Sequence, residues 1–430
     1  MRDVILIMTM IGALPMIFIR PHVGVLLWGW AAIIGPNFLV YGFASSIRYN
    51  FTIAILTFIA WFISKEKIVI PLRSTIVLLL LFAAWGTISA LTSISSSDVV
   101  IDEWVKFLKI LGFSLVIVGL INTRQRIHSL LLIFVISLGY YGVSEGMKFL
   151  ATGGAHHVWG PGFSIIGDNN HFALSLIMLL PIAYYLITYS QNKIVKFSLI
   201  LAFVLTSFAV LGTYSRGGLI GLLAIGIWSV IKTKNRLPII LVGTILGIIL
   251  ITMAPESWFE RMDTIQTATE DRSFMGRVVA WKLSVLLALD HPIFGGGFQA
   301  IQDLAVWLQY SADFHLMDFV PTRQPDTHRA HAAHSIYFQV LGDMGFIGLL
   351  IFLSILVSAW KNTNFIIKQC KDNQHQKWIY DLGKMLQISL IAYMVSGAAL
   401  NMAYFDLTYA VIALTLSLRI IVESDMKDRR

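Results

Sequence analysis

The 430-residue sequence has few charged residues and a single cysteine. Asp, Glu, Lys and Arg make up 13% of the chain, whereas a soluble protein of ordinary composition carries about a quarter. Cys370 alone excludes a disulfide framework and a zinc site built from cysteines. The chain also lacks a basic, aromatic-interleaved soluble segment, which argues against a nucleic-acid partner. Alternation of polar and apolar residues at strand length is absent as well.

Apolar residues are abundant instead. Hydrophobic residues form 57% of the chain and the mean hydropathy is +0.75. Runs long enough to cross ~30 Å of hydrocarbon recur throughout, and backbone groups in lipid must be satisfied within each segment, which favours helices. We therefore predict an all-α polytopic membrane protein with about 12 transmembrane helices. The expected spans are 23–40, 49–64, 74–92, 106–121, 128–150, 171–189, 195–213, 217–231, 237–253, 335–360, 385–403 and 406–422.

The first apolar run, residues 4–19, is short for a full span and makes the expected count 12 or 13. It meets Arg20-Pro21-His22 rather than a small-residue cleavage site, so we do not interpret it as a cleavable signal peptide. It is equally consistent with half of a helical hairpin formed with the next segment.

Lys and Arg mark alternate loops, which predicts the orientation because such residues stay on the cytoplasmic side. The loops 93–103 and 151–170 contain neither residue. The chain therefore divides into N-terminal spans (1–253), a long external segment (254–334) and C-terminal spans with a cytoplasmic tail (335–430). We expect the inner membrane of a bacterium, with the segment in the periplasm. The expected cytoplasmic cations are Lys65, Lys67, Arg73, Arg124, Arg126, Lys193, Lys196, Lys232, Lys234, Arg236, Lys361, Lys368, Lys371, Lys377, Lys384, Lys427, Arg429 and Arg430.

The external segment is too long for an ordinary connection and suggests a function of its own. Residues 276–289 have apolar positions at helical spacing with Arg277 and Lys282 interspersed. We interpret them as an amphipathic helix lying at the membrane surface. His291-Pro292 should end this helix, and the glycines 295–297 predict a tight turn.

Several cations stand on the expected external side, where cations are otherwise scarce. An Arg at a membrane boundary is costly unless it snorkels, pairs or binds an anion, and its planar fork fits phosphate oxygens. Pairing is an open alternative, because the segment has ten carboxylates and six cations. The external cations are Arg216, in the turn Thr213-Tyr214-Ser215-Arg216-Gly217-Gly218, and Arg261, Arg272, Arg277, Lys282, Arg323 and Arg329.

Histidines precede the span at 335. His334, with a reference pKa near 6.5, suits the orientation or deprotonation of a hydroxyl; a capping role is the alternative. The series His328, His331 and His334 invites a zinc interpretation. Steps of three drift about 60° each around a helix, however, and no Glu base accompanies them. We expect neither a metal nor a cofactor.

Polar residues also precede the span at 171. Asp168, Asn169 and Asn170 are good helix caps, and the alternative is that the amides of Asn169 and Asn170 bind sugar hydroxyls. Together with Lys282 and Arg329, these two asparagines are our candidates for further substrate-binding residues. His156 and His157 are expected to be loop residues.

Three of these segments together resemble the O-antigen ligase and polymerase superfamily. They are the Ser-Arg-Gly turn at 215–217, the Gly-Arg-Val-Val-Ala-Trp run at 276–281 with 290–297, and His334-Ser335 followed by Gly345 and Gly348. The resemblance implies a GT-C-like, inverting, metal-independent glycosyltransferase. It would transfer a glycan from undecaprenyl diphosphate to an acceptor, in typical members the lipid A–core, in lipopolysaccharide biosynthesis. By position, Arg216 and Arg277 would hold the diphosphate and His334 would face the acceptor.

The implied chemistry suits these residues. Negative charge grows on the diphosphate as the sugar leaves, and preorganised cations stabilise that transition state. Loss of one such donor commonly costs roughly 10²–10³ in rate. His334 is the candidate to align the acceptor hydroxyl and take its proton.

Other functions remain open. An O-antigen polymerase would use the same donor with a second lipid-linked glycan as acceptor. Trp28-Gly29-Trp30 and Gly35-Pro36 also look like the branch of putative O-glycosylation ligases associated with exosortase systems, for which a protein acceptor is conceivable. A lipid-linked glycan transporter would need cations facing a cavity within the spans, whereas Lys and Arg cluster at span ends. A scaffold would not explain the arginines.

Overall fold

The computed structural model describes residues 1–64, 71–162, 164–233, 236–254, 256 and 272–428. Lys65, Lys67, Lys234, Arg261, Arg429 and Arg430 lie outside the described residues, and so does the side chain of Arg272.

The described regular structure is helical throughout. The α-helices are α1 (Arg2–Ile19), α2 (Pro21–Ile34), α3 (Tyr49–Ile63), α4 (Ser74–Leu91), α5 (Ser97–Leu120), α6 (Arg124–Ala151), α7 (Asn169–Tyr189), α8 (Lys193–Gly212), α9 (Arg216–Lys232), α10 (Leu237–Met253), α12 (Arg272–Asp290), α13 (Leu304–Ala312), α14 (Ile336–Cys370), α15 (Lys377–Ser396) and α16 (Asp406–Asp428). Short 3-10 turns are η1 (Pro36–Leu39), η2 (Phe43–Ser46), η3 (Ala300–Gln302), η4 (Phe314–Met317), η5 (Gln374–Gln376) and η6 (Gly397–Ala399).

The predicted fold class, an all-α polytopic membrane protein, is confirmed. Within the described residues, eight helices are long and apolar enough to cross a membrane, and α2, α3 and α10 are shorter apolar helices. The predicted run 4–19 is one complete helix, α1. The largest boundary differences are at α14, which ends at Cys370 rather than at 360, and at α5, which begins at Ser97 rather than at 106. In α5 the helix continues through a charged stretch from Asp98 to Lys109 that apolarity alone excludes.

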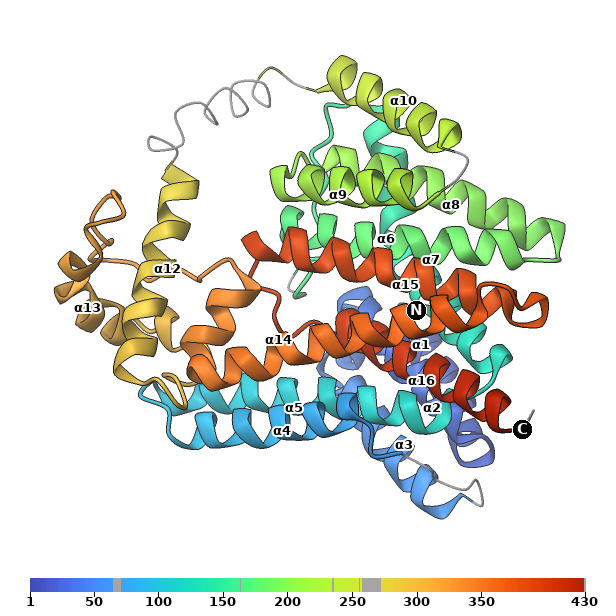
Figure 1. Ribbon diagram of the computed structural model, residues 1–430, viewed down its shortest axis with the longest axis horizontal. Helices are drawn as coiled ribbons and strands as arrows, with labels where there is room; N and C mark the ends of the chain where they lie inside the picture. Colours follow the sequence, from blue (N-terminus) through green and yellow to red (C-terminus); the bar gives the residue numbers. More distant parts are fainter. Residues whose placement is uncertain (65–70, 163, 234–235, 255, 257–271, 429–430) are drawn as a thin grey trace.

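Most of the long helices run roughly along one direction (Figure 1). Among the candidate membrane spans, α7 and α16 are the most buried. Both helices are apolar on all sides, the pattern of a helix surrounded by other helices. Of the apolar windows of these two helices, 78% and 72% are buried. They therefore form the interior against which the other long helices pack.

Hydrogen bonds show which connections between helices lie together at each end of the bundle. At one end, which we call the site end, Tyr214 Oη donates to the carbonyl of Gly154 at 2.6 Å and the Ile94 amide donates to the carbonyl of Gly296 at 3.1 Å. At the other end, the far end, Tyr189 Oη donates to Asp381 Oδ2 at 2.7 Å. The site end is the one predicted to be external, and this orientation stays a prediction.

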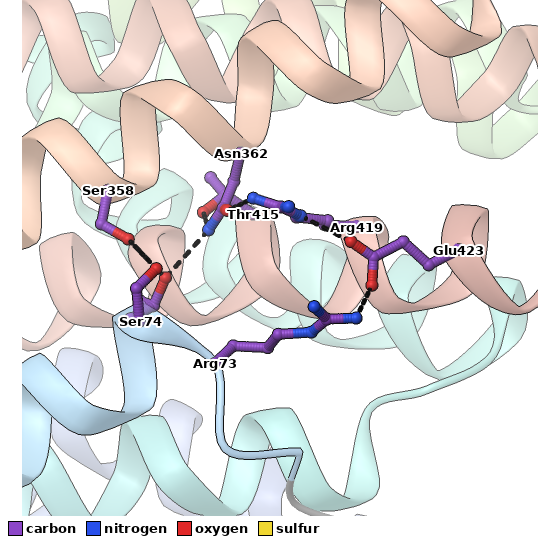
Figure 2. A network of polar contacts seen from close by, with 8 residues as sticks. Arg73, Ser74, Ser358, Asn362, Thr415, Arg419 and Glu423 are labelled. Carbon is purple, nitrogen blue, oxygen red and sulfur yellow. Dashed lines mark hydrogen bonds and ion pairs between the residues drawn. The ribbon is translucent and has the colours of Figure 1, made fainter.

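A polar network joins α4, α14 and α16 toward the far end (Figure 2). Asn362 donates to Thr75 Oγ1 at 3.1 Å and accepts from Arg419 at 3.1 Å, and Arg419 Nε donates to Glu423 at 2.9 Å. Glu423 also pairs with Arg73. Buried polar groups stabilise a bundle only when their hydrogen bonds are made, so this network fixes the three helices relative to one another.

The segment after residue 271 forms a small unit at one end of the bundle, where α12 crosses the direction of the long helices (Figure 1). The predicted amphipathic helix is present as α12. Its apolar face packs against protein: Val279, Leu283 and Leu287 belong to a second core shared with α13, η3 and η4. The position of the helix at the membrane surface stays a prediction. The sequence pattern showed an apolar face, and α13 supplies a protein partner for it.

This unit docks onto a break in α14. Gly345 has φ 69°, and a Cβ on it would lie 2.6 Å from the carbonyl oxygen of Pro292. A Cβ on Gly295 would lie 2.5 Å from the Gly345 nitrogen. The amides of Gly296 and Gly297 then donate to the carbonyls of Gly342 and Asp343. The glycines at 295–297 and Gly345 therefore let the two backbones come into direct contact, and this contact attaches the α12 unit to α14.

Candidate functional site

The start of α7 is an ordered polar turn at the site end. Asp168 caps the helix: its Oδ1 accepts from the amides of Asn170 at 2.8 Å and His171 at 3.3 Å. Asn169 is buried, and its Nδ2 donates to the carbonyl of Thr213 at 2.9 Å. The same Nδ2 lies 3.3 Å from His157 Nε2. The predicted cap is confirmed. The amides of this turn are thereby held in place, and their binding to sugar stays a prediction.

The start of α9 is tied to this turn. The Ser215 hydroxyl donates to Asn170 Oδ1 at 2.7 Å and accepts from the Gly218 amide at 2.9 Å, which caps α9. Tyr214, just before it, has φ 49°, a conformation that costs a non-glycine residue free energy and often marks functional positions. Arg216 is the first residue of α9, so its cation stands where the helix dipole disfavours one and favours an anion.

Helix α12 brings Arg277 to the segment that leads into α14. Trp281 donates its indole N–H to the carbonyl of Ala333 at 2.6 Å, and its ring stacks on Phe338 with centroids 5.1 Å apart. Arg277 lies four residues earlier on the same helix face. This contact therefore places the guanidinium beside His334, the residue after Ala333.

The electrostatics of His334 confirm this proximity. Burial, and next the charge of Arg277, lower the pKa of His334 to about 4; His171 and His331 act in the same direction and Asp168 opposes them. These side chains come from the first turn and cap of α7, from α12 and from the irregular connection before α14. His334 itself has φ 45°. At neutral pH its imidazole is uncharged, which leaves it able to accept a hydrogen bond.

Two buried polar atoms next to these groups have no hydrogen-bond partner among the described residues: Nε2 of His171 and Oγ of Ser335. His171 Nδ1 lies 3.0 Å from the carbonyl of Ile165. A carbonyl only accepts, so Nδ1 carries the proton and Nε2 offers a lone pair. Buried polar atoms are normally satisfied, so these two atoms are available to a water molecule or to a polar ligand.

The remaining predicted substrate-binding residues lie elsewhere in the unit. Lys282 is buried; its Nζ donates to Thr322 Oγ1 at 2.7 Å and lies 4.3 Å from the centre of the Phe314 ring. Burial lowers its pKa, and Asp318 opposes the shift. Arg329 is exposed. The structure thus ties Asn169 and Asn170 to the start of α9, where Arg216 stands, and brings Arg277 within electrostatic reach of His171 and His334. Lys282 has its contacts inside the second core. Roles for Lys282 and Arg329 in substrate binding stay predictions.

The histidine series does not form a metal cluster in the described part of the chain, where no group of three or more His, Cys, Asp or Glu is arranged to hold an ion. The His331 ring packs edge-on against the Trp307 ring, with centroids 5.7 Å apart. The backbone amide of His328 donates to Asp326 Oδ1 at 2.8 Å. His156 is paired with Glu145 at 2.6 Å.

Three residues at the site carried no predicted role, although each stands within a motif: His171, Trp281 and Ser335. His171 follows a helix cap and faces inward, which a single sequence does not distinguish from a buried structural histidine. Trp281 lies four residues after Arg277, and that helical spacing was a usable signal. The buried state of the Ser335 hydroxyl depends on packing between α12 and α14 and has no sequence signal.

Comparison with protein families gives two matches. Residues 201–353 match the O-antigen ligase family, and residues 1–191 match a family of unknown function, DUF5935. No curated protein matches the sequence. The first match spans α9, α12 and the start of α14, and so includes Arg216, Arg277 and His334.

Proposed function

Because this chain belongs to the O-antigen ligase and polymerase superfamily, through its domain at residues 201–353, we propose that it transfers a glycan from undecaprenyl diphosphate to an acceptor hydroxyl at the site end, on the periplasmic face of the bacterial inner membrane. The family indicates ligase or polymerase activity of the glycosyltransferase type. We propose lipid A–core as the acceptor, in lipopolysaccharide biosynthesis. A protein acceptor is the second candidate for the same site.

The observation that carries this proposal is the group of Arg277, His171 and His334 at the start of α7. Arg277 is close enough to His334 to lower the pKa of its imidazole, and Arg216 begins the helix whose cap, Ser215, bonds to the same turn. We assign Arg216 and Arg277 to the donor diphosphate. As the anomeric C–O bond breaks, its electron pair passes to the diphosphate, and two fixed guanidiniums stabilise that charge.

The acceptor side of the reaction is assigned to the histidines. The acceptor oxygen forms the new bond to the anomeric carbon, opposite the leaving diphosphate, and inverts the configuration. Uncharged His334 accepts the hydrogen bond of the attacking hydroxyl and takes its proton as the bond forms. The lone pair of His171 Nε2 and the Ser335 hydroxyl supply further contacts for a sugar. This arrangement uses no divalent metal.

A transfer assay tests the proposal. Purified protein, lipid-linked glycan and lipid A–core are combined with excess chelator, and the product is measured by gel shift. We expect full activity with chelator and a loss of roughly 10²–10³ in rate for Arg216→Ala, Arg277→Ala or His334→Ala. Unchanged rates in all three variants would remove the site assignment. Loss of activity on chelation would remove the metal-free mechanism, and a product formed only with a second lipid-linked glycan would make the chain a polymerase.

A further inference from the structure

Two adjoining cavities lie at the far end of the bundle, away from the proposed transfer site. One has a volume of about 380 Å³ and the other about 530 Å³, and Gln125 and Ser129 line both. Both cavities lie at the first turns of α6. The smaller is lined by Arg20, His22, Thr123, Gln125, Arg126 and Ser129.

The lining of the two cavities is cationic at one side. Arg20 and Arg126 line the smaller cavity and Arg124 the larger, and no Asp or Glu lines either one in the described part of the chain. Arg126 is held by the turn before α6, where it donates to the carbonyl of Leu120 at 2.9 Å. Clusters of guanidiniums without carboxylates are the usual setting for phosphate.

The position of Arg124 is fixed without neutralising its charge. Its guanidinium carbon lies 5.5 Å from the centre of the Tyr189 ring and 5.4 Å from that of Trp378. Cation–π contacts hold a guanidinium but leave its N–H donors and its charge available to an anion. Tyr189 is itself anchored through its hydroxyl to Asp381. The cation therefore stands in a rigid aromatic frame beside the larger cavity.

One wall of the larger cavity is aliphatic, while Gln125, His128, Ser129 and Ser190 line it on the polar side with Arg124. Leu132, Leu186, Val195 and Leu199, from α6, α7 and α8, line it below the cations. A soluble anion gains nothing from contact with aliphatic side chains, whereas a lipid acyl chain is stabilised by burying its apolar surface against them. The combination of an arginine-lined mouth and a leucine-lined wall between membrane helices matches an amphiphile with a phosphate head group.

We propose that these two cavities bind one anionic phospholipid, with its phosphate between Arg20, Arg124 and Arg126 and an acyl chain along Leu132, Leu186 and Leu199. The lipid would come from the leaflet at the far end, which is the leaflet predicted to be cytoplasmic and in which anionic lipids attract basic residues. It is a structural ligand of α6, α7 and α8, distinct from the glycan donor at the site end. The proposal does not depend on the transfer reaction.

Native mass spectrometry of the purified full-length chain tests this site. The probes are phosphatidylglycerol, phosphatidylethanolamine with the same acyl chains, and inorganic phosphate. A cation near an anionic lipid contributes about five-fold in affinity, so Arg20→Gln should weaken phosphatidylglycerol binding about five-fold. Arg20→Gln with Arg124→Gln should weaken it about 25-fold. Arg20 is exposed, so its substitution leaves the fold intact.

Lys193→Gln is the matched control, because Lys193 is an exposed cation at the start of α8 that lines neither cavity. It should leave phosphatidylglycerol binding unchanged. Equal binding of both phospholipids, or equal loss in the Lys193 variant, overturns the site. Full displacement of phosphatidylglycerol by millimolar inorganic phosphate overturns the lipid assignment, since it would make the cavity a site for a soluble anion.

Discussion

The indole of Trp281 donates to the carbonyl of Ala333 at 2.6 Å, and this bond ties α12 to the residue before His334. Arg277 lies one turn earlier on α12, so one contact sets the position of both the cation and the imidazole. His334 holds its backbone at φ 45°, a conformation that persists only where neighbours enforce it. The residue proposed to bind the donor, Arg277, and the residue proposed to face the acceptor, His334, are therefore positioned by the same contact.

Trp281→Phe should slow glycan transfer about 10- to 100-fold, because a misplacement of about 1 Å at a reacting group has that effect. A smaller aromatic ring is left to stack on Phe338, and the bond to Ala333 is lost. The transfer assay gives the rate, and thermal unfolding in detergent gives the stability. Trp307→Phe is the control: it loses an equivalent bond, to the carbonyl of Asp326 at 2.8 Å, in the second core. If both variants lose stability and rate in the same proportion, Trp281 has no positioning role.

Gly345→Ala should destabilise the protein by about 2–4 kcal/mol, since the added methyl meets the Pro292 carbonyl and the positive φ is unfavourable for alanine. Gly247→Ala in α10 is the control, because nothing lies within 4 Å of a Cβ there; it should be neutral or slightly stabilising. The melting temperatures of the two variants measure the difference. Equal melting temperatures would mean that the joint between the α12 unit and α14 has no strict requirement for glycine.

The pH dependence of transfer should reflect the neutral imidazole of His334. The pKa of this group is lowered from the usual 6.5 to about 4, so the ring stays uncharged as pH falls from 8 to 5 and becomes protonated only near 4. We expect kcat/KM to lose no activity through His334 above pH 5 and to fall near pH 4. An acid limb centred near 6.5 that disappears in His334→Gln would show that Arg277 and burial do not act on this histidine.

Asn362→Leu should destabilise the bundle by about 1–3 kcal/mol while leaving the transfer rate unchanged. The substitution removes the acceptor of Arg419 and the donor to Thr75 at the far end (Figure 2), and partners left unsatisfied carry that cost. Ser417→Ala on the neighbouring α16 is the control, because its buried hydroxyl has no partner among the described residues. Thermal unfolding separates the two. A large drop in transfer rate at unchanged stability would mean that the network communicates with the site end.

The sequence was most informative where chemistry is local. Composition predicted the fold class, and the helices follow the apolar runs closely, because a membrane span depends on little beyond length and apolarity. The position of α12 was predicted from its periodicity. Its partner was not, since α13 is a nine-residue helix whose contact with α12 depends on the fold of the whole segment.

The candidate site shows the same division. Arg216, Arg277 and His334 stood out because their charge or residue type is unusual at those positions. Their grouping around Asp168, and the inclusion of His171 and Ser335, depends on contacts between residues far apart in the chain. Gly345 and Gly348 stood out in the sequence only as positions of the family pattern, with no role assigned to them. The structure gives Gly345 a docking role at the break of α14, which positive φ and backbone contact explain.

Binding of the sugar-free donor lipid tests the central claim most directly. Undecaprenyl diphosphate is titrated against wild type, Arg277→Gln and His334→Gln in detergent, with affinity read by native mass spectrometry. Two guanidiniums on the diphosphate and an imidazole on the acceptor predict at least a ten-fold loss for Arg277→Gln and wild-type affinity for His334→Gln. Equal affinities for all three proteins, or a loss confined to His334→Gln, would contradict the account.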